Sequence, residues 1–192
     1  PLQSGSNTVL QRMRRKYSME MFGERLDRLK EALPGLAITS DVIVGFPGET
    51  EEEFMETYRF IEKHKFMELH VFPYSKRTGT PAAKMEDQVP EDIKNERVHK
   101  LIALSDQLAK EYASDYEDTV VEVIPEEAFK EDPTNKLYVG YTPNYLKVLF
   151  EGNEEMIGKL VKVKITEAGY PYNKGVFVKQ EMEEILKQAV SS

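Results

Sequence analysis

The sequence contains no cysteine and no tryptophan among its 192 residues. Without thiols, these residues can form no disulfide, no thiolate nucleophile and no cysteine-ligated metal site. Histidine is also scarce, because only His64, His70 and His99 are present, and their spacing is not that of a paired metal site. We therefore interpret the three histidines as surface or core residues.

Long apolar runs and a secretory signal are absent as well. No stretch approaches the roughly 20 apolar residues that a helix needs to span a bilayer, and the first residues do not form a signal peptide. We expect a cytoplasmic protein with no membrane partner. The length and the 40% hydrophobic content suffice for one medium domain, or for a domain followed by a small module.

The formal net charge of -8 is distributed unevenly along the chain. Residues 34–135 carry eleven basic and twenty-three acidic side chains, whereas residues 1–33 and 136–180 each carry seven basic and four acidic ones. The basic character is therefore confined to two separate segments. Such asymmetry is expected when an anionic partner meets only part of the surface.

Residues 37–50 combine a strand, a glycine-bent loop and a helix start. The first eight are mostly apolar or β-branched, which is typical of a parallel strand covered on both faces. Gly45 and Gly48 supply backbone freedom where the chain leaves the strand. Thr50 and Glu53 have the spacing of a capping box, so a helix is predicted to begin immediately after the threonine.

The loop at residues 44–50 is a candidate binding site. In α/β folds, ligands bind in the loops at the carboxyl ends of the strands. An ordinary turn, whose glycines serve only the backbone geometry, is an equally open interpretation.

Helices and strands alternate through the first half of the chain. Apolar spacing predicts helices at about residues 7–13, 19–33, 51–63 and 90–114 and a second strand at residues 69–72. This order predicts parallel strands with right-handed crossovers. Residues 1–6 have the pattern of a strand end without a preceding strand, so we expect a fragment with an unpaired sheet edge.

Two polar segments flank these elements. The basic cluster Arg12, Arg14, Arg15 and Lys16 is either a solvated helix end or a clamp for a carboxylate or phosphate. The loop at residues 73–83 mixes aromatic, basic and glycine residues. Its length indicates a function, although a flexible surface connection fits the same composition.

The pattern changes beyond residue 115. Short β-branched segments at 119–124, 137–141, 146–150, 160–166 and 176–178 are separated by Pro, Gly and Asn turns, which is typical of a small antiparallel β-barrel. Tyrosines alternate with lysines there. Aromatic faces for bases beside ammonium groups for phosphates predict an RNA-binding surface, made of Lys136, Tyr141, Tyr145, Lys147, Lys162 and Lys164. In the alternative interpretation, the tyrosines belong partly to the core. Residues 181–190 are predicted to form a terminal helix or to fray.

Three segments taken together resemble the radical S-adenosylmethionine methylthiotransferases. They are Pro1–Ser6 with Arg12–Tyr17, then Asp41–Thr50, then Pro73–Ala83. The amino-acid sequence of residues 74–81 and 141–145 is most similar to that of the subfamily that acts on threonylcarbamoyladenosine beside the tRNA anticodon.

The resemblance covers the whole chain and implies its fold. The expected class is α/β, with the second half of the catalytic (β/α) barrel over residues 1–114. A small antiparallel barrel of the TRAM type, similar to an OB-fold, follows over residues 115–180, and a tail over residues 181–192.

The same resemblance implies a tRNA-modifying enzyme that adds a methylthio group, with the tRNA anticodon arm as partner. Its cofactors are S-adenosylmethionine and two 4Fe–4S clusters, whose cysteine ligands are absent from this chain. We therefore expect the isolated chain to be inactive, and no catalytic residue is assigned. The residues expected near S-adenosylmethionine or the target base are Gln3, Ser4, Arg14, Arg15, Val44, Gly45, Phe72 and Tyr74.

Two alternatives stay open at this point. The chain could be an RNA-binding or assembly module without catalysis, or its family member could act on another modified adenosine or on a ribosomal protein. The sequence leaves the oligomeric state undetermined.

Overall fold

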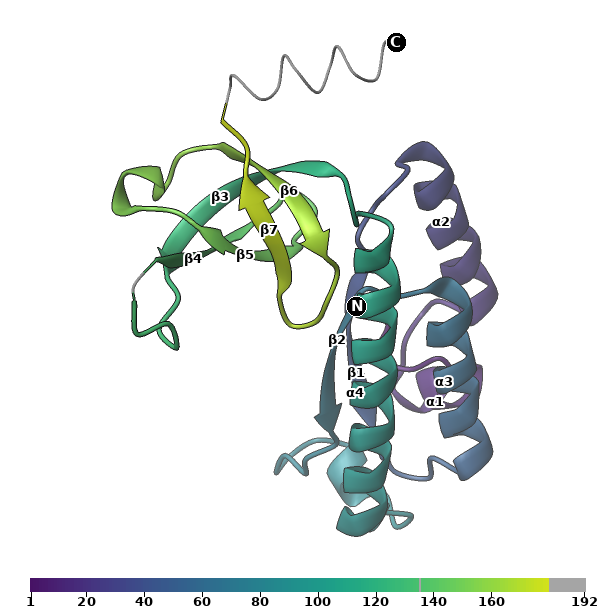
Figure 1. Ribbon diagram of the computed structural model, residues 1–192. Helices are drawn as coiled ribbons and strands as arrows, with labels where there is room; N and C mark the ends of the chain where they lie inside the picture. The colour runs from purple at the N-terminus through teal and green to yellow at the C-terminus, as the bar shows by residue number, and fades with distance from the viewer. Residues whose placement is uncertain (135, 180–192) are drawn as a thin grey trace. The chain divides into compact units, whose positions relative to one another are not determined.

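The computed structural model describes residues 1–134 and 136–179. The chain divides into two compact units, the first comprising Pro1–Ala109 and the second beginning at Lys110 (Figure 1). This division falls five residues before the domain boundary expected from the sequence. The reason lies in Tyr112, near the end of a long helix, whose hydroxyl accepts a hydrogen bond from Asn144 Nδ2 at 2.7 Å within the second unit. The terminal helix expected at residues 181–190 lies outside the described residues.

The first unit alternates helices and strands as the sequence predicts. Its elements are α1 (Asn7–Arg12), α2 (Met19–Ala32), β1 (Thr39–Val44), α3 (Glu51–His64), β2 (Glu68–Pro73), the short 3-10 helix η1 (Ala82–Lys84) and α4 (Glu91–Ser114). The strands β1 and β2 pair in parallel. Gln3 extends this sheet by a parallel bridge to Val42, so the expected strand end at the start of the chain is confirmed.

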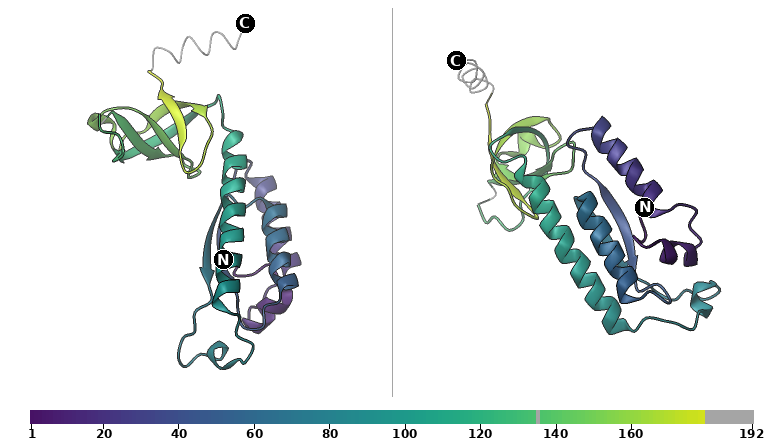
Figure 2. Two further views of the ribbon diagram at one scale, coloured as in Figure 1. Left: turned by 60° about the horizontal axis from the view of Figure 1, so that its bottom comes forward. Right: turned by 90° about the vertical axis from the view of Figure 1, so that its right-hand side faces the viewer.

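The core of this unit lies between the four helices and one face of the sheet. It includes Leu10 and Leu26 from α1 and α2, Phe54 from α3, and Leu101 and Leu104 from α4. Figure 2 shows α4 running alongside α3 and the strands in both views. No helix among the described residues is both long and apolar enough to cross a membrane.

The prediction that β1 is covered on both faces is wrong. Ser40, Val42 and Val44 are buried, but Asp41 and Ile43, which alternate with them, are only partly buried. In β2, Leu69 is buried whereas Phe72 is 52% exposed. Because the core forms on one face of the sheet, the opposite face is left open to a ligand.

The second unit is a closed five-stranded barrel. Its strands are β3 (Val120–Ala128), β4 (Leu137–Tyr141), β5 (Lys147–Glu151), β6 (Val161–Glu167) and β7 (Asn173–Phe177), with the 3-10 helix η2 (Glu154–Met156) between β5 and β6. The spatial order is β3-β4-β5-β7-β6, closed by pairing of β3 with β6. This arrangement confirms the small OB-like barrel.

One pairing differs from the antiparallel barrel that the sequence predicts. The strands β5 and β7 are parallel, whereas all other neighbours are antiparallel. The intervening strand β6 crosses over to pair with β3, so β7 enters beside β5 in the same direction. The barrel core contains Val123, Val148, Phe150, Val163 and Ile165.

Candidate functional site

The turn after β1 is shaped by the close approach of α4. Gly45 and Gly48 have φ values of 70° and 76°, a conformation that glycine adopts at little cost. A Cβ atom on Gly45 would lie 2.3 Å from Cγ of Lys94. At Gly45, glycine is therefore required by packing as well as by the turn.

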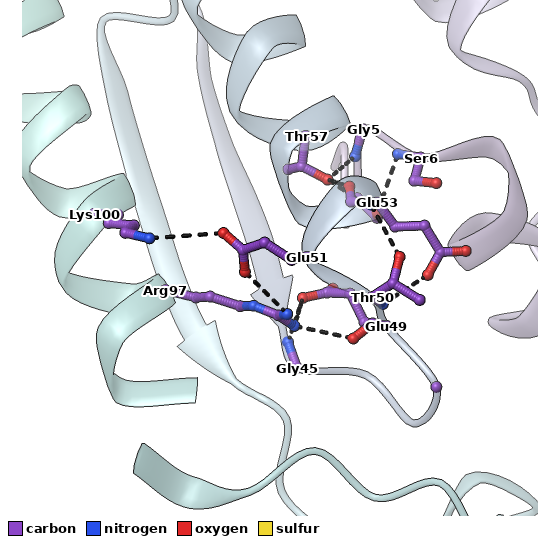
Figure 3. Close-up of polar contacts among 12 residues, drawn as sticks. Gly5, Ser6, Gly45, Glu49, Thr50, Glu51, Glu53, Thr57, Arg97 and Lys100 are labelled. Atoms are coloured by element: carbon purple, nitrogen blue, oxygen red, sulfur yellow. Dashed lines mark hydrogen bonds and ion pairs between the residues drawn. The ribbon is translucent and has the colours of Figure 1, made fainter. Parts of the chain in front are cut away.

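A buried ion pair attaches this turn to α4. Glu49 is 6% exposed, and its carboxylate accepts hydrogen bonds from the Gly45 amide at 2.9 Å and from Arg97 Nη1 at 2.8 Å. Burial raises the pKa of Glu49 even though Arg97 and the Gly45 amide act to lower it. Figure 3 shows Arg97 between Glu49 and Glu51, with Lys100 also directed at Glu51. These contacts fix the turn and engage both terminal nitrogens of Arg97, Nη1 with Glu49 and Nη2 with Glu51.

Another ion pair occupies the first residue of the basic cluster. Arg12 Nη2 lies 2.6 Å from Glu53 Oε2 and also donates to the carbonyl of Gly48 at 3.2 Å. Burial acts to raise the pKa of Glu53, but hydrogen bonds from Arg12, Thr8 and the Thr50 amide outweigh it and lower the pKa to about 2. The predicted capping box of Thr50 and Glu53 is confirmed.

Arg14 and Arg15 differ from Arg12 because no described residue forms an ion pair with either of them. Their main-chain amides donate to the carbonyls of Gln11 and Leu10. The two guanidinium groups therefore remain available to an anion.

Two adjoining pockets lie at the carboxyl ends of the strands, on the sheet face opposite the core. The larger has a volume of ≈ 590 Å³ and is lined by Gln3, Asp41, Ile43, Phe72, Pro73, Tyr74, Ser75, Arg77, Thr80 and Ala82. The smaller has a volume of ≈ 240 Å³ and is lined by Gln3, Arg12, Met13, Arg14, Arg15, Ile43, Phe46, Tyr74, Thr80, Pro81, Ala82 and Met85. Shared lining residues make the two a continuous candidate site.

The structure brings five of the eight expected cofactor residues to these pockets. Gln3 and Tyr74 line both pockets. Phe72 lines the larger one, and Arg14 and Arg15 line the smaller one.

The other three expected residues face away from the pockets. Ser4 is fully buried, and its Oγ lies 3.3 Å from Oγ1 of Thr57 in α3. Val44 is 1% exposed and belongs to the core, while Gly45 is covered by Lys94. The side chains of Ser4 and Val44 point toward the helices, because alternation along the chain sends them to the face opposite the pockets.

The hydroxyl of Tyr74 is buried and has no hydrogen-bond partner. Its ring packs edge-on against Phe46, with 5.3 Å between the ring centroids. Because a buried unpaired hydroxyl is costly, a polar group of a bound ligand would satisfy it.

The sequence interpretation did not single out Asp41, Ile43 or Arg77 as lining residues. Period-two alternation opposite Val42 and Val44 could have identified Asp41 and Ile43. No pattern in the sequence identified Arg77 within its loop.

On the barrel, Tyr145 is 72% exposed and has a φ of 65°. The preceding turn is fixed by Thr142, whose Oγ1 lies 2.7 Å from Asn144 Oδ1 and accepts from the Leu146 amide at 2.9 Å. A left-handed conformation is unfavourable for a side chain of this size. An exposed ring held in this way by a fixed turn suits contact with a partner.

A second aromatic group surrounds Lys147. Its Nζ lies 5.7 Å from the ring centroid of Tyr141 and 4.8 Å from that of Tyr172. Burial acts to lower the pKa of Lys147, but the two phenol oxygens outweigh it and raise the pKa. The ammonium group therefore stays charged beside two aromatic faces.

The remaining predicted RNA-binding lysines lie in different surroundings. Lys164 forms an ion pair with Asp118 at 3.1 Å, and Lys162 precedes it on the same face of β6. Lys136 is exposed immediately before β4. Tyr138, in contrast, is 4% exposed, so the alternative that some tyrosines belong to the core holds for this one.

Comparison with known proteins identifies both units. The Radical SAM superfamily model matches residues 1–61, and the TRAM domain model matches residues 127–178. The chain is 75% identical over 187 residues to the threonylcarbamoyladenosine tRNA methylthiotransferase MtaB of Bacillus subtilis, covering 97% of this chain and 42% of that protein. The chain belongs to the radical SAM methylthiotransferase family.

The chain is less similar to relatives named tRNA-2-methylthio-N(6)-dimethylallyladenosine synthase. The one from Lachnoclostridium phytofermentans is 41% identical over 184 residues, covering 96% of this chain and 39% of that protein. The one from Acetivibrio thermocellus is 46% identical over 165 residues, covering 86% of this chain and 34% of that protein. The chain thus spans less than half the length of these relatives.

The pockets contain groups that suit S-adenosylmethionine, the cofactor of this family. Arg14 and Arg15 are free to bind its carboxylate, and the buried hydroxyl of Tyr74 lacks a partner that a polar ligand could supply. Iron–sulfur clusters do not fit this chain, because it has no cysteine. Among the described residues, no group of three His, Asp or Glu side chains is placed to hold a metal ion.

Proposed function

We propose that this chain is the part of a tRNA-modifying methylthiotransferase that holds S-adenosylmethionine and the target nucleoside. The observation that carries the proposal is the pair of adjoining pockets at the strand ends, lined by unpaired arginines, in one chain with a TRAM barrel. The target is threonylcarbamoyladenosine beside the anticodon. Its support is the 75% identity to an enzyme named for this nucleoside.

The two pockets divide the binding task. S-adenosylmethionine occupies the smaller pocket, with its carboxylate at Arg14 and Arg15, and supplies the radical chemistry of the family when bound. The target adenine lies in the larger pocket against the exposed ring of Phe72. Tyr74 lines both pockets and so contacts both ligands.

The TRAM barrel binds the anticodon arm. The exposed ring of Tyr145 offers a stacking face, and the ammonium of Lys147, beside Tyr141, offers a positive charge. A tRNA substrate places the protein in the cytoplasm. The family's two 4Fe–4S clusters must be held by residues outside this chain, since thiolates are their ligands.

A chimeric enzyme tests this function. The matching segment of Bacillus subtilis MtaB is replaced by this chain, and the chimera is expressed in a strain that lacks the native enzyme. Mass spectrometry of the tRNA nucleosides is expected to show methylthio-modified threonylcarbamoyladenosine. Changing Arg14 and Arg15 together to Gln should lower the product roughly tenfold or more, because charge-assisted hydrogen bonds to the carboxylate are lost.

The control in this experiment is the thermal stability of each chimera. Both arginines lie outside the core, so the double change should leave stability unaltered. A folded, cluster-loaded chimera that modifies only dimethylallyladenosine would contradict the proposed target. Equal product from the chimera and its double variant would contradict the role of the two arginines.

A further inference from the structure

Arg77 is an unpaired cation at the larger pocket. Its main chain is fixed, because the amide and Oγ1 of Thr80 donate to its carbonyl at 3.2 and 2.8 Å. The side chain is exposed, lines the pocket, and has no ion-pair partner among the described residues. The Arg77 guanidinium is therefore available to an anion that enters this pocket.

Three other basic side chains of the first unit are paired, in contrast. Arg12 lies 2.6 Å from Glu53, Lys94 lies 2.6 Å from Glu91, and Arg97 lies 2.8 Å from Glu49. Residues 34–135 contain more than twice as many acidic as basic side chains. An arginine left unpaired within such an acidic segment, and at a pocket, is best explained by an external anionic group.

The walls of the larger pocket suit a flat aromatic group. Ile43 and Phe72 are directly paired across β1 and β2, and Pro73 and Tyr74 continue the same wall. Phe72 is 52% exposed despite its size, so a purine base can cover its ring. Asp41 also lines the pocket and repels anions, which leaves the side of Arg77 as the favourable place for a negative substituent.

We infer that Arg77 is a specificity-determining residue that binds a carboxylate on the N6 substituent of the target adenosine. This inference depends on the proposed function. A threonylcarbamoyl substituent ends in the carboxylate of threonine, which is ionised at neutral pH, whereas a dimethylallyl substituent carries no charge. The planar guanidinium binds a carboxylate with two parallel hydrogen bonds, so Arg77 favours the first substituent over the second.

Binding of modified anticodon hairpins to the 192-residue chain tests this role. Three hairpins are compared by fluorescence anisotropy: one with threonylcarbamoyladenosine, one with its methyl ester, and one with unmodified adenosine. The ester keeps the shape of the substituent but removes its charge. The unaltered chain is expected to bind the carboxylate hairpin roughly three- to tenfold more tightly than the ester, the gain of a partly solvated charge-assisted hydrogen bond.

The Arg77→Gln variant is expected to bind the carboxylate and ester hairpins with equal affinity. Lys76→Gln is the matched control, because it removes the same charge from the adjacent residue, which does not line the pocket. The control should keep the full preference for the carboxylate. Circular dichroism of each variant checks that the chain stays folded.

The outcomes separate this inference from the proposed function. The inference is overturned if the unaltered chain binds all three hairpins equally, or if Arg77→Gln keeps the preference for the carboxylate. In either case Arg77 does not recognise the substituent, while the proposed binding of RNA by the chain is unaffected. If the unaltered chain binds none of the hairpins, the proposed role of this chain in holding tRNA is overturned, and the role of Arg77 with it.

Discussion

Ion pairing distinguishes the structural arginines from those available to ligands. Arg12 binds the carboxylate of Glu53 in helix α3, and Arg97 binds that of Glu49 in the turn after β1. Both arginines therefore stabilise the turn and the helix beside the pockets. Arg14, Arg15 and Arg77 line the pockets without a carboxylate partner among the described residues. Removing a member of the first group should alter stability, and removing a member of the second should alter binding.

The pair of Arg12 and Glu53 makes stability depend on pH. The pKa of Glu53 is about 2 in the folded chain, below its ordinary value of 4.5. The ionised carboxylate therefore adds stability above pH 4.5 that is lost as the pH falls toward 2. We expect Glu53→Gln to lower the free energy of unfolding by about 1–2 kcal/mol at neutral pH, a value discounted for partial exposure.

Urea unfolding of the wild type and of Glu53→Gln over this pH range measures the effect. The difference between them should shrink as the pH approaches 2. Glu52→Gln serves as the control, since its ion pair with Arg59 is exposed and should contribute less than about 1 kcal/mol. A difference that stays constant with pH would rule out the lowered pKa as its cause.

At the scale of elements, the site depends on how closely α4 approaches the turn after β1. The helix stripe Leu101 and Leu104 packs into the core, and this packing brings Lys94 over Gly45. Arg97 from the same helix then reaches Glu49. The turn is thereby held rigid below the pockets, which helps to fix the strand ends that line them.

Substitution of Gly45 by Ala tests this approach. The change imposes both a left-handed alanine and a clash with Lys94, so we expect a loss of about 3 kcal/mol. Gly79→Ala is the matched control, because its φ is +88° but nothing lies within 4 Å of the added Cβ. It should cost only about 1 kcal/mol. Thermal unfolding compares the two, and equal losses would show that α4 does not restrict the turn.

At the scale of the whole molecule, the proposed function requires an acidic chain to bind a negatively charged RNA. The net charge of -8 opposes nonspecific binding, so contact has to rely on local features. The barrel supplies such features in Tyr145 and in Lys147 with its two tyrosines. We therefore expect stacking to contribute more to RNA affinity than overall charge does.

Replacement of Tyr145 by Ala tests the contribution of stacking. Loss of the exposed ring should weaken binding of an anticodon hairpin by roughly 1–3 kcal/mol, the worth of one stacked base. Tyr145→Phe keeps the ring and the backbone strain, so its affinity should match the wild type. Isotherms at two salt concentrations, with circular dichroism on each variant, measure both effects. Equal affinity of a folded Tyr145→Ala variant would place the RNA contacts elsewhere.

The sequence by itself determined the local elements of this protein. The capping box of Thr50 and Glu53, the long helix that follows Pro90 and the turn glycines were all predicted from residues close together in the chain. Short-range interactions govern these features, so a short window contains their causes. The absence of cysteine likewise excluded cluster ligands without any structure.

Only the tertiary structure decided which side chains reach the site. Alternation along β1 separates Asp41 and Ile43 from Val42 and Val44, but it does not say which set the helices cover. The ion pair of Arg12 with Glu53 joins residues 41 positions apart. The sequence of the basic cluster therefore could not show which of its arginines is paired and which are available to a ligand. The parallel pairing of β5 with β7 has the same origin, because it depends on where β6 crosses the barrel. Contacts between distant segments are set by the packing of the whole unit, and no local pattern specifies them.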